Sequence, residues 1–207
     1  MTGPTWTIVV AGGRGERFGE RKQYLHLGGR RVLDWALAAA ADHSDGVVLV
    51  VPLDVAHEPE PGVHAVVPGG RTRSDSVRAG LEAVPADAEV VVVHDAARPV
   101  PVPAVWEAVL AAVAAGADAA VPAVPVTDTL RSLDGATVDR SRLVAVQTPQ
   151  AFRAAALRQA HAGAGEATDD ASLVEAAGGR VVVVDGDPRN LKITTPVDLA
   201  LAELLCR

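Results

Sequence analysis

The chain has 207 residues, of which 49% are hydrophobic and 22% charged, a composition typical of a globular protein with a substantial core. Its net charge of −7 argues against a polymeric nucleic-acid partner, because proteins that grip a phosphate backbone carry a basic excess or stripe. No apolar run reaches the ~20 residues that a membrane span requires, and glycines interrupt the apolar stretch near the N-terminus. We therefore predict a cytoplasmic protein with no nucleic-acid or membrane partner, folded as a single domain over residues 1–207.

Short β-branched runs alternate with Ala- and Leu-rich helical stretches along the chain, a pattern typical of α/β proteins. Strands are expected at Thr7–Val10, Val47–Val51, His64–Val67, Val90–His94, Ala119–Val121 and Arg180–Val184. Helices are expected at Val32–Ala41, Ser76–Val84, Pro103–Ala115, Thr168–Ala177 and after a Thr195 cap. Most of the strands are apolar without alternation, as in parallel strands that are covered on both faces. The order predicts a Rossmann-like, doubly wound, mostly parallel sheet.

A glycine-rich segment, residues 11–22 (AGGRGERFGERK), follows the first predicted strand. Glycines let backbone N–H groups approach an anion closely, and the basic side chains add charge where phosphates would lie. The segment is not a P-loop, because Glu20 follows Gly19 where that motif has lysine. It is not a dinucleotide fingerprint either, because Phe18 replaces the third glycine. Two interpretations stay open: another kind of phosphate-binding loop, and a tight turn with solvated basic side chains.

A second glycine-containing segment, residues 69–77 (GGRTRSDSV), follows a strand and opens a helix. Backbone N–H groups and hydroxyls at a helix N-terminus suit a phosphate or the polar edge of a base. Taken alone, the segment is better explained as a capped helix start.

The sequence HDAARP, residues 94–99, stands at the carboxyl end of the apolar strand that begins at Val90. Ligands of open α/β sheets bind beyond such strand ends. Asp95 can hold Mg²⁺ against a triphosphate, and Arg98 can form a bidentate pair with a phosphate. The alternative is an Asp95–Arg98 ion pair in a loop, and His94 is expected to orient its neighbours and not to bind metal.

Residues 122–148 break the alternation of strands and helices. Two extended pieces, Val124–Leu130 and Val138–Val146, flank an Asp134-Gly135 pair, which is a hairpin signal. We predict a β-arm that protrudes from the sheet. An isolated hairpin cannot bury its own apolar side chains, so we expect this arm to pack against a second copy in a homodimer.

Lys192 stands between two apolar residues, Leu191 and Ile193, shortly before the last helix. A surface position is the default for a lysine. In a strand-like setting, however, Lys192 would point opposite to two buried neighbours, and in a doubly wound sheet that direction leads toward a cleft.

Taken together, these segments resemble the 2-C-methyl-D-erythritol 4-phosphate cytidylyltransferase family, whose members are the third enzyme of the non-mevalonate isoprenoid pathway. The shared motifs follow the family's order along nearly the whole chain: AGG-x-G-x-R-(x)4-KQYL, GG-x-x-R-x-x-SV-x-x-GL, HDAARP, PVTDTL, VDR with TPQ eight residues after its arginine, TDDAS and NLKIT-x-P-x-D. Gly12 departs from the common alanine, and the loop from Arg17 to Lys22 is short, with Arg21 where proline usually precedes the lysine. The resemblance implies the nucleotide-diphospho-sugar transferase fold and the transfer of CMP from CTP to methylerythritol phosphate, with Mg²⁺ as cofactor.

The resemblance also implies a role for each matching residue. The catalytic cations would be Arg17, Lys22 and Lys192. The nucleotide would be bound by Ala11, Gly12, Gly13, Gly15, Gly70, Ser76 and Asp95. The polyol phosphate would be bound by Asp95, Arg98, Thr129, Arg140, Thr148 and Lys192. Asp95 would also hold the metal, and the arm would carry Thr129 and Arg140 into the partner's site.

The expected chemistry needs no general base, because the attacking phosphate oxygen is already an anion. A catalyst of this kind must reduce the repulsion between anions and hold the nucleophile in line with the leaving group. Three alternatives stay open. They are a ribitol 5-phosphate cytidylyltransferase, a guanylyltransferase of molybdenum-cofactor type, and a nucleotide-binding regulator without catalysis.

Overall fold

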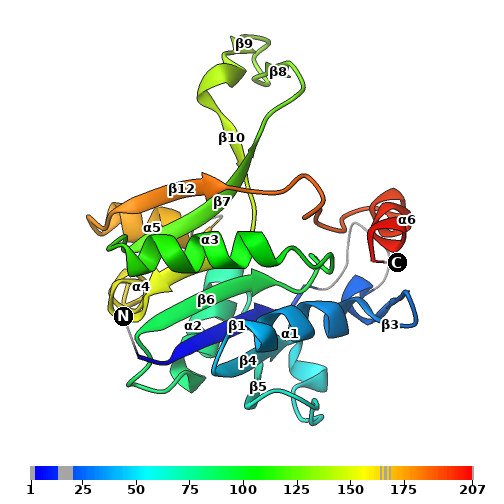
Figure 1. Ribbon diagram of the computed structural model, residues 1–207, viewed down its shortest axis with the longest axis vertical. Helices are drawn as coiled ribbons and strands as arrows, with labels where there is room; N and C mark the ends of the chain where they lie inside the picture. The colour runs from blue at the N-terminus through cyan, green and yellow to red at the C-terminus, as the bar shows by residue number, and fades with distance from the viewer. Residues whose placement is uncertain (1–2, 14–20, 164, 166, 168, 207) are drawn as a thin grey trace.

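The computed structural model describes residues 3–13, 21–163, 165, 167 and 169–206. Its centre is an eight-stranded sheet in which β10, β7, β11, β6, β1, β4 and β5 follow one another and β12 pairs with β7 (Figure 1). These strands are β1 (Thr5–Val10), β4 (Gly46–Val51), β5 (Ala65–Pro68), β6 (Val90–Asp95), β7 (Ala119–Pro125), β10 (Val144–Val146), β11 (Gln150–Arg153) and β12 (Val181–Asp185). Two short hairpins, β2 (His26–Leu27) with β3 (Arg30–Arg31) and β8 (Leu130–Arg131) with β9 (Thr137–Val138), lie outside it. The mostly parallel sheet that the sequence predicts is confirmed.

Helices cover both faces of the sheet (Figure 1). They are α1 (Val32–Asp42), α2 (Arg73–Ala83), α3 (Pro103–Ala114), α4 (Ala154–His161), α5 (Asp170–Ala176) and α6 (Pro196–Leu205). Helices α1 and α3 contribute to one core cluster, whereas α2, α4 and α5 contribute to the cluster on the opposite face. Helix α6 belongs to a third, smaller cluster around Ile193.

The unbroken apolar strands are explained by burial on both faces. In β1, Ile8 packs in the cluster of α2 and Val9 in the cluster of α1, and neither is exposed. In β4 all six residues are buried. Because successive side chains of a strand point to opposite faces, a strand covered on both sides must be apolar throughout.

Several elements were not predicted from the sequence, among them β11 and α4. Strand β11 pairs antiparallel with both β6 and β7 and so departs from the parallel pattern. Helix α4 follows it directly.

The strand-like setting expected around Lys192 is wrong, because residues 191–194 run as irregular backbone.

The predicted β-arm is present and rises from the sheet between β7 and β10 (Figure 1). Its tip turns at Gly135, whose backbone φ is 93° and whose N–H donates to the Ser132 carbonyl at 2.9 Å. A single turn of 3-10 helix, η3 (Arg140–Arg142), interrupts the returning piece, which is therefore less extended than the sequence suggests. Leu133, Val144 and Val146 are exposed on the arm.

Within the described ranges, no helix combines the length and the apolar character that crossing a bilayer requires.

Candidate active site

The carboxyl ends of four parallel strands meet at one edge of the sheet, and the loops that follow them begin there. Val10 of β1 stands in register with Asp95 of β6. The backbone N–H of Ala11 donates to Val50 at 2.7 Å, and that of Gly69 donates to Val51 at 2.7 Å. This edge is where open α/β sheets bind ligands, and it carries three of the segments that the sequence singles out.

Gly12, Gly70 and Ser76 lie together at this edge, although they come from two different loops. A Cβ atom at Gly12 would lie 3.6 Å from the Ser76 hydroxyl, and the Gly70 N–H donates to that hydroxyl at 3.2 Å. A Cβ atom at Gly70 would lie 2.1 Å from the Cβ of Asp75, so no side chain fits there. Thr72 and Asp75 form a capping box that starts α2 at this point. The structure thus brings the predicted nucleotide positions of the two loops side by side.

Gln23 anchors the first loop, a role that the sequence analysis did not assign. Its buried amide donates to the carbonyl of Ala11 at 2.8 Å and to that of Gly13 at 3.1 Å. Gln23 belongs to the 3-10 turn η1 (Lys22–Tyr24), so these bonds fix the backbone of Lys22 beside the loop. The KQYL motif placed Gln23 next to Lys22 but gave no sign of its partners. The predicted residues Gly15 and Arg17 lie outside the described residues.

Asp95 is the electrostatic centre of the site. Its carboxylate is buried, with Oδ2 2.5 Å from the Lys192 ammonium and Oδ1 3.8 Å from Nε of Arg73. Burial acts to raise the pKa of Asp95, but the charges of Lys192 and Arg73 outweigh it and hold the pKa at about 2. The carboxylate is therefore ionised throughout the physiological pH range.

Lys192 reaches Asp95 because its segment is fastened to the loop after β6. The N–H of Ile193 donates to the Ala97 carbonyl at 2.8 Å, and the Ile193 side chain is fully buried. The Lys192 side chain keeps 40% of its surface exposed while its ammonium contacts Asp95. Of the two neighbours of Lys192 that were expected to be buried, Ile193 is buried and Leu191 is half-buried.

Thr148 and His94 support Asp95 from the other side. The hydroxyl of Thr148 accepts from the Asp95 backbone N–H at 3.0 Å and lies 3.3 Å from Nδ1 of His94. Nε2 of His94 lies 3.3 Å from the Arg98 carbonyl. Burial lowers the pKa of His94 to about 4, so the ring is neutral at physiological pH. His94 therefore positions its neighbours as a neutral ring.

Arg98 is not used in an ion pair with Asp95, which was the alternative interpretation. Its Nη1 donates to the Asn190 carbonyl at 2.6 Å, while its buried Nε has no hydrogen-bond partner among the described residues. Burial lowers the pKa of Arg98. Buried donors are usually satisfied, so a guanidinium with an unused N–H is suited to an anionic ligand.

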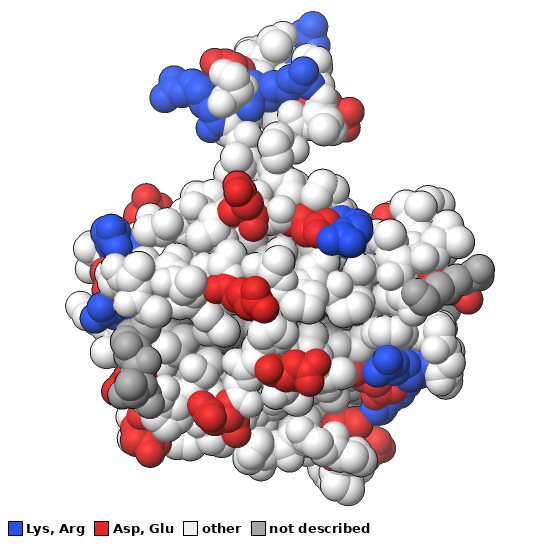
Figure 2. Space-filling view, viewed as in Figure 1, with Lys and Arg blue, Asp and Glu red and all other residues white. Residues whose placement is uncertain are grey.

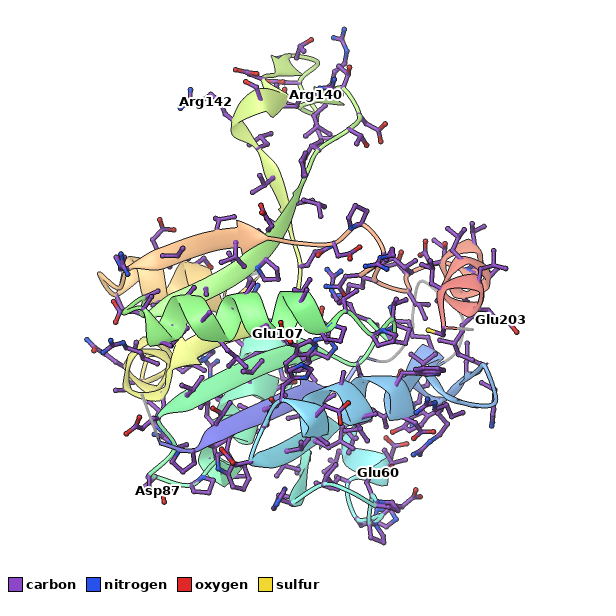
Figure 3. The ribbon with its side chains drawn as sticks, viewed as in Figure 1. Glu60, Asp87, Glu107, Arg140, Arg142 and Glu203 are labelled. Carbon is purple, nitrogen blue, oxygen red and sulfur yellow. The ribbon has the colours of Figure 1, made fainter. Side chains whose placement is uncertain are left out.

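Thr129 and Arg140 are not brought to Asp95 within one chain. Arg140 lies at the arm tip, away from the sheet (Figure 3), where it donates to the Thr127 carbonyl. Thr129 is exposed on the arm. Their expected role in a partner's site stays a prediction.

The donor set at Asp95 fits Mg²⁺ held mainly by a ligand's phosphates. Across the described ranges, no group of three or more His, Cys, Asp or Glu side chains is placed to hold a metal ion. Mg²⁺ is commonly bound by one or two carboxylates together with the phosphates of a nucleotide. Asp95 is ionised, and its Oδ1 lies 3.8 Å from Nε of Arg73, which is beyond hydrogen-bond distance. This oxygen can therefore supply such a carboxylate ligand.

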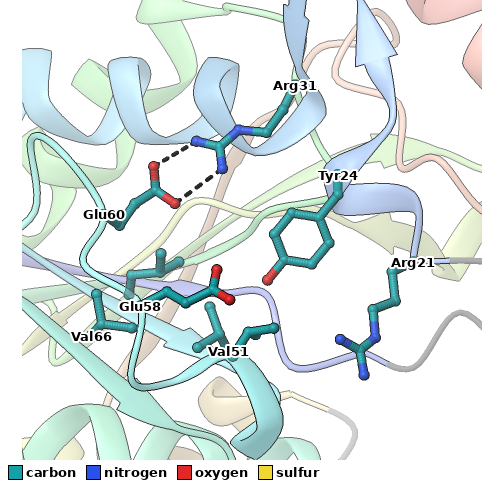
Figure 4. A pocket seen from close by; sticks show the side chains of 9 residues that line it. Arg21, Tyr24, Arg31, Val51, Glu58, Glu60 and Val66 are labelled. Atoms are coloured by element: carbon teal, nitrogen blue, oxygen red, sulfur yellow. Dashed lines mark hydrogen bonds and ion pairs between the residues drawn. The ribbon is translucent and has the colours of Figure 1, made fainter.

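A separate cavity of about 250 Å³ lies beside β4 and β5 and is bordered by β3 and by the segment that contains Glu58 and Glu60 (Figure 4). Tyr24 and the aliphatic side chains of both strands line it, and Arg31 and Glu60 close one side with an ion pair of 2.5 Å. None of the predicted site residues lines this cavity, so we place the chemistry at Asp95 and not here.

Comparisons with known proteins show the family of this chain. The family model described as 2-C-methyl-D-erythritol 4-phosphate cytidylyltransferase matches residues 5–207. Proteins of that name from Nocardia farcinica and Rhodococcus jostii are 47% and 46% identical to this chain, each over 98% of it and over 94% and 95% of their own lengths. The crystal structure of the Thermus thermophilus protein of that name superposes with a TM-score of 0.84 at 41% identity, covering 97% of this chain and 98% of its own. The chain belongs to the 2-C-methyl-D-erythritol 4-phosphate cytidylyltransferase family.

Proposed function

We propose that this chain transfers CMP from CTP to 2-C-methyl-D-erythritol 4-phosphate, giving 4-diphosphocytidyl-2-C-methyl-D-erythritol and pyrophosphate. One observation supports this best. The ion pair of Lys192 with the buried Asp95 stands at the carboxyl edge of the sheet, beside Thr148 and the partly unsatisfied Arg98. Family membership over residues 5–207 supplies the reaction that this arrangement serves.

The reaction depends on charge and alignment. The oxygen of the polyol phosphate attacks the α-phosphorus of CTP, the bond from that phosphorus to the bridging oxygen breaks, and pyrophosphate leaves. Lys22 and Lys192 would offset the negative charge that develops there, as preorganised donors do in other transferases. Arg98 and Thr148 would hold the polyol phosphate in line for the attack. No proton needs to be removed from the nucleophile.

Gly12, Gly70 and Ser76 would receive the nucleoside part of CTP. Because Gly70 has no side chain, the chain can pass close to Asp75 at the start of α2, where the loop and the helix meet. Mg²⁺ is also part of the proposal: when bound, it would neutralise triphosphate charge, and Asp95 would be its protein ligand.

A homodimer formed through the β-arm completes the proposal. Basic and acidic side chains lie together at the arm tip, and both kinds also occur on the visible face of the body (Figure 2). The exposed arginines of the tip are Arg131, Arg140 and Arg142. Exposed arginines at the tip and exposed apolar strands fit an arm that docks on a second copy and reaches a phosphate there. The cytoplasmic location expected from the sequence stays a prediction.

The test is pyrophosphate release from each of the four nucleoside triphosphates with a panel of polyol phosphates. We expect the highest kcat/KM for CTP with methylerythritol phosphate, and no turnover in excess EDTA. A higher kcat/KM with ribitol 5-phosphate would replace the acceptor but keep cytidylyl transfer. A protein that binds CTP and releases no pyrophosphate with any acceptor would instead be a nucleotide-binding regulator.

A further inference from the structure

A chain of ionisable side chains runs from α4 through the protein to Asp95. Nε2 of His161 lies 3.0 Å from Oδ1 of Asp170, whose Oδ2 accepts from Nη1 of Arg73 at 2.6 Å. Nε of the same arginine lies 3.8 Å from Oδ1 of Asp95. The four residues come from α4, α5, α2 and β6, so the fold assembles the chain from distant parts of the sequence.

The outer part of this chain is fixed by burial. The Asp170 side chain is not exposed at all, and that of His161 is 2% exposed. A buried carboxylate without a partner costs several kcal/mol, so Asp170 must keep Arg73 close. A second contact fastens the same two regions, because the N–H of Ala167 donates to the buried Ser74 hydroxyl at 3.3 Å. The guanidinium of Arg73 is therefore held in one place.

Asp95 thus forms ion pairs with two cations, and one of the two side chains is held in place more firmly than the other. The Arg73 side chain is 23% exposed and anchored by Asp170, whereas the Lys192 side chain is 40% exposed and its ammonium has Asp95 as its ion-pair partner. If Lys192 turns from Asp95 to a phosphate, Arg73 remains as the arginine within ion-pair distance of the buried carboxylate, whereas Arg98 acts on it from farther away. Without Arg73, the attraction between Asp95 and Lys192 would hold the lysine back, because opposite charges a few ångströms apart attract strongly in a partly buried site.

We infer that Arg73 is a positioning residue, anchored by Asp170, which stabilises the Asp95 carboxylate and so leaves Lys192 available to the phosphates of the reaction. This inference rests on the proposed function, since it concerns a step of that reaction. It assigns no contact between Arg73 and substrate. Loss of Arg73 should therefore lower kcat far more than it raises the KM for CTP.

The experiment measures kcat and KM by pyrophosphate release for Arg73→Gln, Arg73→Lys and the double variant Arg73→Gln/Asp170→Asn. The double variant removes both charges of the buried pair and guards against unfolding caused by an unpaired Asp170. The matched control is Arg78→Gln. Arg78 also lies on α2 and forms an ion pair, with Asp75 at 2.6 Å, but this pair is not part of the series of side chains that leads from His161 to Asp95. Thermal unfolding checks that every variant is folded at the assay temperature.

We expect Arg73→Gln and the double variant to lose roughly 10- to 100-fold in kcat, the usual effect of removing an outer partner of a site residue. Arg73→Lys should recover part of the loss because it keeps the charge, and Arg78→Gln should match the wild type. A second arm repeats Arg73→Gln in a Lys192→Ala background at high enzyme concentration. If Arg73 acts through Lys192, adding Arg73→Gln to Lys192→Ala should change kcat by less than about threefold relative to Lys192→Ala alone, because the two losses are not additive.

Several outcomes would overturn the inference. They are an unchanged kcat in folded Arg73→Gln, a loss carried mainly by the KM for CTP, or losses that multiply fully in the Lys192→Ala background. A wild-type protein without pyrophosphate release would instead refute the proposed function, so the two failures are distinguishable.

Discussion

Asp95 illustrates how much one buried residue organises at this site. Its carboxylate holds Lys192, and its backbone N–H holds Thr148. Desolvation alone would favour the neutral acid, and only the cations around it keep it ionised. The charge of Asp95 and the position of Lys192 are therefore mutually dependent.

The first prediction concerns the two lysines. Lys22→Ala and Lys192→Ala should each lower kcat by roughly 10²–10³-fold, about the effect of one lost transition-state donor. The melting temperature of Lys192→Ala should fall, because the buried Asp95 carboxylate loses the cation that lies closest to it. Steady-state pyrophosphate release and thermal unfolding measure the two effects. Near-normal turnover in either variant would contradict the assigned electrostatic role.

At the scale of elements, the segment between Asn190 and α6 carries Lys192 to the site, and the start of α6 holds that segment in place. One carboxylate oxygen of Asp198 accepts from the Thr194 N–H at 2.8 Å, the Thr194 hydroxyl at 2.7 Å and the Thr195 N–H at 2.7 Å. Burial acts to raise the pKa of Asp198, but these hydrogen bonds lower it to about 2. The capping box thus fixes the backbone that follows Lys192.

The second prediction follows from this cap. Asp198→Asn should reduce the free energy of unfolding at neutral pH by about 1 kcal/mol, the typical cost of a damaged N-terminal cap. Because the folded-state pKa lies below the ordinary 3.8, the contribution of Asp198 is complete above pH 4 and is lost as the pH falls toward 2. Thermal unfolding across this range should show the two proteins converging at the acid end. A stability difference that stays constant from pH 7 to pH 2 would contradict the ionic cap.

The sequence was informative about elements whose signals are local. The apolar runs around Ile8 and Val48 predicted central parallel strands, and Asp134-Gly135 predicted the tip of the arm. Strand β11 was missed because QAFR is short, mixed in polarity and becomes a strand only by pairing with β6 and β7. Likewise, the pairing of Arg73 with Asp170 spans 97 positions, and no local pattern signals such a contact.

At the scale of the whole molecule, the arm is the feature that one chain leaves unexplained. It holds Arg140 away from Asp95, and it exposes apolar side chains that two strands cannot bury. An arm that docks on a twofold-related copy answers both observations, because each site then takes residues from two chains.

The third prediction tests this sharing by mixing two inactive proteins. Arg140→Ala and Lys22→Ala should each be inactive alone. In a mixed dimer one site carries both defects and the other carries neither, so subunit exchange should restore up to half of the wild-type activity per mixed dimer. Light scattering and differently tagged subunits verify assembly and exchange. A monomer in solution, or no recovery after confirmed exchange, would refute the shared site.

The Lys192–Asp95 ion pair also makes this protein suited to magnetic resonance. Lys22 and Lys192 are the only lysines of the chain. Reductive methylation with ¹³C-formaldehyde would therefore label two side-chain amines besides the α-amino group, and methylated lysine keeps its charge. The Lys192 probe would lie against an ionised carboxylate and should shift when CTP draws the ammonium away. Its resonance would follow the departure of Lys192 from Asp95 in the unmutated protein, one ligand addition at a time.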